Sequence, residues 1–326
     1  MMQAVVLDEY GDVDVLRIQE VPIPEPSPTE VLVKVAATAL NRADLLQRRG
    51  LYPGPEATFE IPGIEFSGTI ESSGKEANKY PVGTKVMGIV GGGGYAEYLV
   101  TDERQIMPIP EGVSLIDAAS IPEVWITAFD ALIDKGNLQP NQKCLIHAGG
   151  SGVGTAGIQI ARELGADVAV TASAAKLETC EQLGADLTVD YHDEDFVEAV
   201  NKWTGSTGVN VILDVVGGDY LERNFRCVAA QGTIVQVGAM GGGKSDINLG
   251  VLLQKRLTLI GTVLRSRSKE EKIAIAEAFI ARITPKFENG SYKPVIDTQY
   301  PFHEIAAAHT YMESNKNTGK ILIELP

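Results

Sequence analysis

A run of glycines near the middle of the sequence has the clearest chemical meaning. Residues 149–154 read GGSGVG; they follow the apolar run CLIHA and precede an amphipathic stretch at residues 155–164. A glycine turn that opens a helix after a buried strand presents backbone N–H groups to an anion, and the helix dipole favours negative charge there. Within a strand–helix–strand unit of about 30 residues, this context is typical of a site for a dinucleotide pyrophosphate. The residues expected to hold that group are Gly149, Ser151, Gly152, Val153 and Gly154.

The turn departs from the general G-x-G-x-x-G pattern, because Ser151 stands at the middle glycine. A second interpretation is therefore the G-x-S-x-G turn that presents a nucleophilic serine in α/β-hydrolases. Gly149 and Ser151 fit that pattern, but Val153 stands where the last glycine is required. Candidate partners in the order Ser…Asp…His are Asp214, His303 and His309. The strand–helix–strand context favours the dinucleotide interpretation.

The strand after the glycine turn indicates which dinucleotide would bind. NAD sites usually carry Asp or Glu about 20 residues past the glycines, where the carboxylate bonds the ribose 2′-hydroxyl. Here the strand ends in Ala172 and Ser173, and Lys176 follows without any carboxylate. A hydroxyl donor and a positive charge suit a 2′-phosphate, so NADPH is favoured over NADH; the alternative is that Lys176 is an ordinary solvated helix lysine.

Composition excludes several other classes of ligand and partner. The 326 residues carry 43 acidic and 28 basic side chains, a net charge of −15, which argues against nucleic acid and anionic membranes as partners. The four histidines and three cysteines show no metal-ligand spacing. An odd number of well-separated cysteines also fits a reducing compartment, and neither a secretory signal nor a membrane-spanning run is recognisable. A cytoplasmic location is expected.

The elements around the glycine turn follow a regular order. Apolar runs typical of strands recur every 19 to 24 residues, with helical patterns between most of them; they begin near Cys144, Val168, Leu187, Val209, Thr233 and Leu257. This alternation predicts an α/β fold with a Rossmann-type, doubly wound parallel sheet. The first third of the chain reads instead as short β-rich runs separated by glycine, proline and asparagine.

Helical patterns at residues 115–135, 268–287 and 302–314 complete the chain, with a last strand at 320–325. That strand is separated from the strand–helix series, so we expect it to return to the N-terminal β-rich region. The second domain would then be mainly β and discontinuous. The predicted boundaries are 1–122 and 266–326 for this domain, and 123–265 for the dinucleotide-binding domain.

At this point the chain resembles the zinc-free quinone oxidoreductases of the medium-chain dehydrogenase/reductase superfamily, in the branch of the p53-inducible and zeta-crystallin-like proteins. The resemblance covers essentially the whole chain, and the serine in the glycine turn is shared with that branch. It implies a GroES-like fold for the β-rich catalytic domain. The matching stretches are LNRADLLQRRGLYP (40–53), PGIEFSGTI (62–70), IHAGGSGVGTAGIQ (146–159), LLQKRLTLIGTVLRSR (252–267) and NTGKILIEL (317–325).

In zinc-dependent members of that superfamily, a C-x-x-D stretch and a G-H-E stretch supply metal ligands. The corresponding stretches here read NRAD (41–44) and GIE (63–65), so Asn41 and Ile64 stand in place of two ligands. No metal is expected, and the Lewis acid that lowers the pKa of an alcohol is missing. Reduction of an electron-poor acceptor becomes more plausible than oxidation of an alcohol.

The resemblance also implies where NADPH and the acceptor would lie. Asn41 and Tyr52 would adjoin the nicotinamide: Asn41 hydrogen-bonds the acceptor oxygen, whereas Tyr52 does the same, relays a proton or only walls the pocket. Ser173, Lys176 and Tyr191 would hold the 2′-phosphate. The residues expected along the nicotinamide half are Thr127, Gly238, Leu264, Ser266 and Asn317.

Three functions follow from these features. The leading hypothesis is hydride transfer from NADPH to a quinone. The second is NADPH-dependent reduction of an α,β-unsaturated carbonyl, either an enone or an enoyl-CoA or acryloyl-CoA thioester, whose CoA moiety would suit the neighbouring Arg42, Arg48 and Arg49. The third is an NADPH-binding sensor or structural protein with weak turnover. Residues 256–264 form an apolar edge strand, so a homodimer through that edge is also expected.

Overall fold

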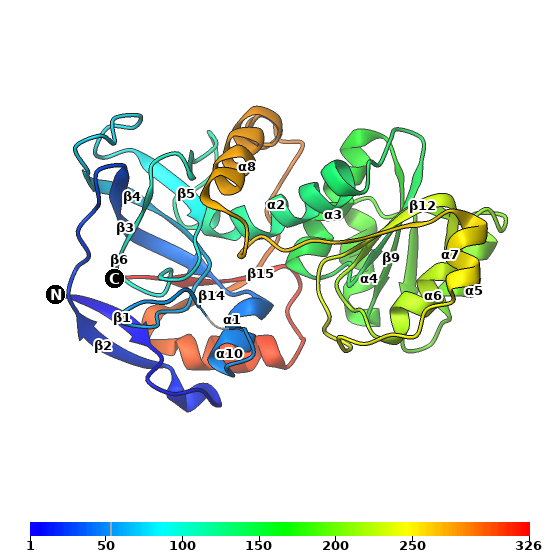
Figure 1. Cartoon of the computed structure of the whole chain (residues 1–326), viewed down its shortest axis with the longest axis horizontal. Helices are drawn as coiled ribbons and strands as arrows, with labels where there is room; N and C mark the ends of the chain where they lie inside the picture. The colour runs from blue at the N-terminus through cyan, green and yellow to red at the C-terminus, as the bar shows by residue number, and fades with distance from the viewer. Residues whose placement is uncertain (53) are drawn as a thin grey trace. The chain divides into compact units, whose positions relative to one another are not determined.

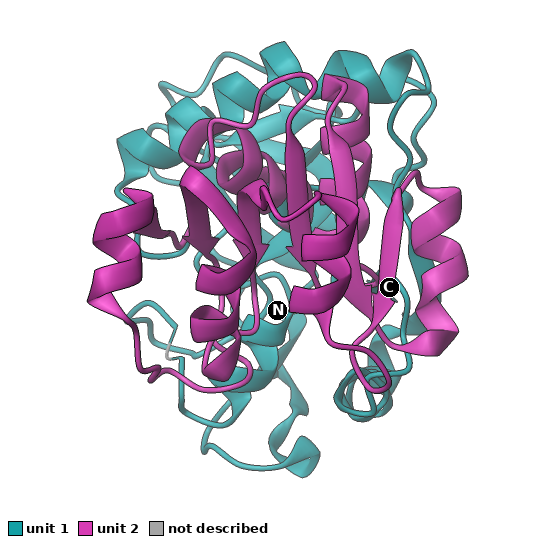
Figure 2. Ribbon diagram, turned by 90° about the vertical axis from the view of Figure 1, so that its right-hand side faces the viewer, with its two compact units in different colours: residues 1–123, 265–326 teal, residues 124–264 magenta. Residues whose placement is uncertain are grey.

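The computed structural model describes residues 1–52 and 54–326, which divide into two compact units. Unit 1 comprises residues 1–123 and 265–326, and unit 2 comprises residues 124–264. Figure 2 distinguishes them as teal and magenta. Unit 1 is built from both ends of the chain, so the two-part, discontinuous organisation is a property of the fold.

Unit 2 contains a six-stranded parallel sheet with the order β10-β9-β8-β11-β12-β13. The order reverses between β8 and β11, which is the switch point where ligands bind in open α/β sheets. This arrangement confirms the predicted Rossmann-type sheet. The strands are β8 (Lys143–His147), β9 (Asp167–Ala172), β10 (Leu187–Asp190), β11 (Val209–Asp214), β12 (Val228–Gln236) and β13 (Thr258–Gly261).

Helices alternate with these strands and bury the apolar faces of the sheet (Figure 1). Helix α3 packs on β8 and β9, α4 on β9 and β10, α6 on β11 and β12, and α7 on β12. Most strand residues point into a covered face, which explains why the strands read as continuous apolar runs. The helices are α3 (Gly152–Leu164), α4 (Ala174–Gln182), α5 (Phe196–Trp203), α6 (Asp219–Cys227) and α7 (Leu249–Lys255).

Unit 1 is built around a seven-stranded sheet with the path β14-β15-β3-β4-β5-β7 and β6 paired to β3. The last strand, β15, pairs antiparallel with β3, so the predicted return to the N-terminal region is confirmed. Strands β1 (Met2–Val6) and β2 (Arg17–Val21) form a separate ribbon. The sheet strands are β3 (Glu30–Ala39), β4 (Glu65–Ser73), β5 (Lys85–Ile89), β6 (Tyr98–Asp102), β7 (Ile106–Pro108), β14 (Ile296–Pro301) and β15 (Lys320–Glu324).

Two long helices predicted from the sequence are divided in the structure. The pattern over residues 115–135 becomes a 3₁₀ turn (Asp117–Ser120), helix α2 (Pro122–Phe129) and a π-helical segment (Asp130–Lys135). The pattern over 268–287 becomes α8 (Lys269–Arg282) and α9 (Thr284–Glu288). The breaks before α2 and α9 lie beside Pro122 and Pro285, since proline has no N–H to donate and therefore favours the first turn of a new helix. The change from α2 to the π-helical segment at residues 129–130 has no proline beside it.

The other helical segments of unit 1 are short. Helix α1 (Arg42–Arg48) follows β3 directly, and at its start the Asp44 carboxylate accepts a hydrogen bond from the Asn41 N–H at 2.8 Å. Helix α10 (Ile305–Glu313) packs against β14 and β15, and single 3₁₀ turns occur at Val13–Val15 and Phe302–Glu304. In the part of the chain that the structure describes, no helix combines the length and the apolar character needed to cross a membrane.

Candidate functional site

The glycine turn lies between β8 and α3, at the carboxyl edge of the parallel sheet. Ala148 adopts a left-handed conformation (φ 55°), and the Ser151 hydroxyl caps α3 by accepting a hydrogen bond from the Gly154 N–H at 3.0 Å. The first N–H groups of a helix have no acceptor within the helix. The N–H groups of Gly152 and Val153 are therefore suitable donors to an anion, as the sequence predicts.

Gly154 is required by the packing of the turn. A Cβ atom there would lie 2.4 Å from the Ala148 carbonyl oxygen and 2.5 Å from that of Gly149. Both neighbours are backbone atoms, so no side chain can move aside. The first turn of α3 can approach the preceding loop this closely only because the residue has no side chain.

Lys176 lies against the same turn. A Cβ atom placed on Gly150 would meet the Lys176 side chain, with Cδ at 2.6 Å. Ser173 caps α4 without a side-chain hydrogen bond to the helix, and Tyr191 follows β10 with 44% of its surface exposed. The carboxyl ends of β8, β9 and β10 thus gather all of the residues predicted for the pyrophosphate and the 2′-phosphate at one edge of unit 2.

A buried polar network underlies this edge. His147 Nε2 lies 2.8 Å from Asn224 Oδ1, and His147 Nδ1 lies 3.0 Å from Thr171 Oγ1. The amide oxygen cannot donate, so His147 donates from Nε2 and is neutral, with its pKa lowered by burial. Asn224 donates in turn to Asp214, which accepts from the N–H of Val216 at 2.6 Å. The network ties the loops after β8 and β11 together; sequence reasoning assigned no role to Asn224.

The hydrolase interpretation has no support from these contacts. Asp214 bonds to an amide and to loop N–H groups, and Ser151 is engaged as a helix cap. His309 is buried beside the Tyr95 hydroxyl, 3.1 Å from Nε2, and burial lowers its pKa to about 3. His303 is largely exposed and near Glu304. Among these candidates, the structure brings no serine and histidine into contact.

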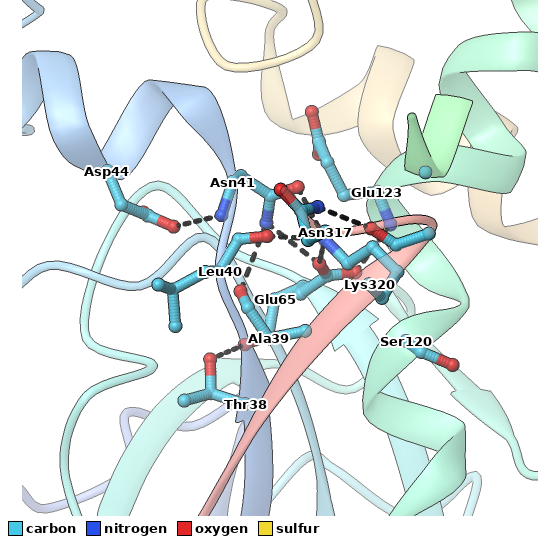
Figure 3. A network of polar contacts seen from close by, with 12 residues as sticks. Thr38, Ala39, Leu40, Asn41, Asp44, Glu65, Ser120, Glu123, Asn317 and Lys320 are labelled. Carbon is cyan, nitrogen blue, oxygen red and sulfur yellow. Dashed lines mark hydrogen bonds and ion pairs between the residues drawn. The ribbon is translucent and has the colours of Figure 1, made fainter. Parts of the chain in front are cut away.

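In unit 1, Asn41 belongs to a buried polar network at the ends of β3, β4 and β15 (Figure 3). Its Nδ2 donates to Glu65 Oε1 at 2.8 Å and to the Ala39 carbonyl at 3.1 Å. Its Oδ1 accepts from Lys320 Nζ at 2.7 Å. Both amide hydrogens of Asn41 are therefore used within the protein, and flipping the amide would set its oxygen against two acceptors.

Lys320 and Glu65 form the ion pair at the centre of this network. Lys320 Nζ lies 2.8 Å from Glu65 Oε1 and donates to the Leu40 carbonyl at 2.7 Å. Glu65 Oε2 accepts from the backbone N–H of Glu123 at 2.8 Å. The two side chains are 4% and 0% exposed, so each charge depends on the other for compensation. Neither residue has a local sequence signal for this role, since the two lie far apart in the chain.

Two further carboxyl groups, Asp44 and Glu123, adjoin this ion pair. Burial raises the pKa of Asp44 to about 6, although the Asn41 N–H and Lys320 favour its ionised form. Burial, together with the charge of Glu65, raises the pKa of Glu123 to about 8. One ammonium group thus faces three carboxyl groups, and the two that are not paired with it retain protons to higher pH than isolated acids.

The raised pKa of Asp44 predicts a pH-dependent stability difference. The folded protein keeps the proton up to about pH 6, whereas the unfolded chain releases it near pH 3.8. The Asp44 contribution to stability is therefore present below pH 3.8 and is lost as pH rises to 6. Asp44→Asn removes this titration. The free energy of unfolding of the variant minus that of the parent should therefore increase by up to about 3 kcal/mol as pH rises from 3.5 to 7.5.

Urea unfolding of both proteins at the two pH values measures this difference. Exposed Asp193, replaced in the same way, serves as the control and should show no comparable change. A constant difference between Asp44→Asn and the parent across the range would mean that Asp44 ionises normally in the folded state.

Tyr52 is held by Arg265 in unit 1. The Arg265 guanidinium lies 4.8 Å from the centre of the Tyr52 ring and donates to the Tyr52 carbonyl at 3.0 Å. It also donates to the Gly91 carbonyl and to Gln47 Oε1. Burial raises the pKa of Tyr52, and Arg265 opposes that shift. The hydroxyl therefore stays protonated near neutral pH and can donate a hydrogen bond. Residue 53 lies outside the described residues.

The remaining predicted residues are distributed over both units. In unit 2, Thr127 is buried on α2, Gly238 follows β12 and accepts from Gln236 Nε2 at 2.6 Å, and Leu264 is buried at the end of the unit. In unit 1, Ser266 follows Arg265, and Asn317 donates to the Gly319 carbonyl near Lys320 (Figure 3).

The described residues contain no group of three or more His, Cys, Asp or Glu side chains placed to hold a metal. The thiols of Cys144, Cys180 and Cys227 are free and buried, and burial raises the pKa of each. Asn41 and Ile64, the two residues that differ from the zinc-dependent pattern, are an amide engaged in hydrogen bonds and a buried aliphatic side chain.

Comparisons with known proteins place this geometry in a family. Residues 27–111 match the alcohol dehydrogenase GroES-like domain, and residues 152–280 match the zinc-binding dehydrogenase family. Quinone oxidoreductase-like protein 2 of Bos taurus is 33% identical over 95% of this chain and 89% of its own. A quinone oxidoreductase structure from Pseudomonas syringae pv. Tomato DC3000 is 28% identical over 99% of this chain and 100% of its own, with a TM-score of 0.92.

The structure of the CurK enoyl reductase is also similar, with 28% identity, a TM-score of 0.89 and coverage of 100% and 99% of the two chains. The similarities extend over both units, so they apply to the sheet of unit 2 and to the GroES-like sheet of unit 1 alike. The chain belongs to the medium-chain dehydrogenase/reductase superfamily of oxidoreductases.

Proposed function

We propose that this protein is an NADPH-dependent quinone reductase that needs no zinc. The observation that carries the proposal is the phosphate-binding edge of unit 2, where Lys176 lies against the glycine turn and no carboxylate follows β9. A carboxylate there would repel a 2′-phosphate, whereas a lysine attracts it. NADPH, once bound, supplies the hydride; the protein supplies binding, orientation and proton donors.

The residues of unit 2 fit such a cofactor. The N–H groups at the start of α3, with Gly149, Ser151 and Gly154 shaping the turn, would hold the pyrophosphate. Ser173, Lys176 and Tyr191 would hold the 2′-phosphate. The residues proposed for the nicotinamide half are Thr127, Gly238, Leu264, Ser266 and Asn317.

The acceptor would meet unit 1 near Tyr52. The Tyr52 hydroxyl is a hydrogen-bond donor at neutral pH, fixed in place by Arg265. Asn41 remains a proposed residue of the acceptor site, but in this arrangement both of its amide hydrogens bond to Glu65 and Ala39, so neither is available to the acceptor oxygen. A quinone accepts hydride readily without a Lewis acid, which agrees with the chemistry of these side chains.

The test is NADPH oxidation with a panel of acceptors: 1,4-benzoquinone, 9,10-phenanthrenequinone, an alkyl enone and crotonyl-CoA. We expect at least one quinone to be reduced faster than both unsaturated carbonyl compounds. If neither quinone is faster, the proposal is lost and the unsaturated carbonyl becomes the substrate class. If the protein turns over none of the four acceptors at an appreciable rate, and NADPH raises its melting temperature, the result would favour an NADPH-binding sensor or structural protein.

Reduction of α,β-unsaturated carbonyls is the second candidate, favoured by the similarity to the CurK enoyl reductase. The three arginines that would attract the CoA moiety already have partners within the protein. Arg48 and Arg49 both pair with Glu313, and Arg42 donates to Asn315. These contacts leave the quinone as the better-supported acceptor.

In Lys176→Ala, the ratio of the NADH dissociation constant to the NADPH dissociation constant is expected to fall by about tenfold or more. The variant loses one charge-assisted contact to the 2′-phosphate, whose contribution is about 1.5–3 kcal/mol. Dissociation constants of both cofactors, measured by fluorescence titration, give the ratio. Exposed Lys202 on α5 provides the control, since its replacement by alanine removes the same charge. An unchanged ratio in Lys176→Ala would remove this residue from the site.

The assembly and location of the protein are further parts of the proposal. Strand β13 is the last strand of its sheet, and Leu259 and Val263 are 40% and 46% exposed. The strand covers only four residues of the predicted 256–264 stretch. We propose that β13 and its flanking residues within 256–264 pair with the same segment of a second copy, which a sedimentation experiment would show as a dimer. Free, buried cysteines and the acidic charge support a cytoplasmic protein that uses neither nucleic acid nor a membrane as partner.

A further inference from the structure

Reduction of a quinone needs a proton as well as a hydride, and the donor is the point that the proposed function leaves open. When hydride adds to the acceptor, its two electrons leave negative charge on an acceptor oxygen. That oxygen must take one proton to give the neutral hydroquinone. The inference below therefore rests on the proposed function and names a residue for this second step.

Asn41 is poorly placed to stabilise the oxygen, because both hydrogens of its amide are used by Glu65 and Ala39. Lys320 is also occupied: its ammonium group contacts Glu65, Asn41 and the Leu40 carbonyl at 2.7 to 2.8 Å. An ammonium group has three hydrogens, so none remains for a ligand. Tyr52 and Glu123 are then the donors to compare in this region of unit 1.

Glu123 is attached to the same network through its backbone and not through its carboxyl group. Its N–H donates to Glu65 Oε2, which fixes the residue at the first turn of α2 beside the ion pair (Figure 3). Across residues 1–52 and 54–326, neither a hydrogen bond nor an ion pair is found for its carboxyl oxygens, and the residue is partly exposed. The backbone thus anchors Glu123 beside the Glu65–Lys320 ion pair, and its carboxyl group, which interacts electrostatically with Tyr52, is not used by the fold.

The charges around Glu123 favour its neutral form. Glu65 and Asp44 are acidic, and the Lys320 charge that opposes them is already paired with Glu65. Arg265 acts in the opposite sense, but it is engaged with Gly91, Gln47 and Tyr52. Tyr52 and Lys272 also interact electrostatically with Glu123. Burial and this imbalance together raise the pKa of Glu123 to about 8, so the group carries a proton at neutral pH.

We propose that the Glu123 carboxyl group is the proton donor to the reduced acceptor. In this step the O–H bond of Glu123 breaks and a bond forms between that proton and the acceptor oxygen, after hydride has moved from NADPH to the acceptor. Bound NADPH would supply the two electrons as hydride, the quinone would become the hydroquinone, and Glu123 would be left as a carboxylate. Because the side chain is partly exposed, water restores its proton before the next turnover.

The first test needs neither cofactor nor substrate. Carbon-13 NMR of protein labelled at the glutamate side-chain carboxyl carbon should show one resonance that titrates near pH 8. That resonance should be missing in Glu123→Gln and present in Glu198→Gln, a control in which an exposed glutamate in the first turn of α5 is changed in the same way. If no glutamate of the parent protein titrates above pH 7, the inference is overturned, whatever the activity.

The second test uses the rate of quinone reduction. In the parent, kcat should fall as pH rises through about 8, because the donor loses its proton. Glu123→Gln should lower kcat at pH 7 about a hundredfold and remove this pH dependence, with little change in the dissociation constant of NADPH. Glu123→Asp keeps an acid that is one methylene shorter, so it should restore part of the rate and the pH dependence.

The two tests separate this inference from the proposed function. A parent protein that reduces no quinone would remove the proposed function, whereas the NMR titration would still report on the protonation of Glu123. A parent that reduces quinones, together with a Glu123→Gln variant of unchanged rate and pH profile, would remove Glu123 as the donor and leave the proposed function standing. Tyr52 would then be the remaining donor.

Discussion

Replacing Lys320 with methionine is expected to lower the free energy of unfolding by about 3–5 kcal/mol. The substitution keeps most of the length of the side chain but removes the ammonium group that pairs with Glu65 at 2.8 Å. Glu65 is completely buried, so its charge would lose its compensation in a region from which water is excluded. Asn41 Oδ1 and the Leu40 carbonyl would lose their donor as well. The combined loss makes this the largest stability effect that we expect from one substitution.

Urea unfolding at pH 7 measures the effect, and Lys316→Met is the matched control because Lys316 is exposed in the same segment. Adding Glu65→Gln to Lys320→Met should recover part of the loss, since the double variant buries no unpaired charge. A loss below about 1 kcal/mol for Lys320→Met would mean that Glu65 is compensated by another group or is not ionised. A double variant less stable than Lys320→Met would show that Glu65 stabilises the fold through its hydrogen bonds more than through its charge.

The elements of unit 2 could be predicted from the sequence because each one carries a local signal. The apolar run CLIHA, the glycines and the amphipathic stretch after them correspond to β8, the turn and α3. Even the substitution of serine for the middle glycine has a local explanation, since Ser151 caps the helix through its hydroxyl. Proline also marked the division of two helices that periodicity alone joined, at Pro122 and Pro285.

The polar network of unit 1 could not be predicted in the same way. Asn41 was singled out as a residue that differs from the zinc-dependent pattern, but its two main partners are 24 and 279 positions away in the chain. Only the pairing of β15 with β3 and of β3 with β4 brings Glu65 and Lys320 together. The available signal was the position of Lys320 directly before the apolar residues 321–323 of the last strand, because a lysine buried with such a strand is almost never unpaired.

The second large effect concerns cofactor binding: Gly154→Ala is expected to raise the dissociation constant of NADPH at least tenfold, or about 1.4 kcal/mol. The new methyl group would lie 2.4 to 2.5 Å from the carbonyl oxygens of Ala148 and Gly149. These are backbone atoms at the turn, so the first turn of α3 must move away from the loop that precedes it. The N–H groups of Gly152 and Val153 would move with it and lose their alignment with the pyrophosphate.

Two other glycine variants make this prediction specific. Gly243→Ala meets no atom within 4 Å and should bind NADPH as the parent does. The atoms nearest to a Cβ on Gly150 all belong to the Lys176 side chain. Gly150→Ala should therefore displace that side chain and weaken the binding of NADPH more than that of NADH, whereas Gly154→Ala should weaken the binding of both cofactors equally. Fluorescence titration with each cofactor gives these ratios, and the melting temperature without cofactor shows whether the variants fold. A folded Gly154→Ala protein that binds NADPH with unchanged affinity would show that the pyrophosphate does not depend on this turn.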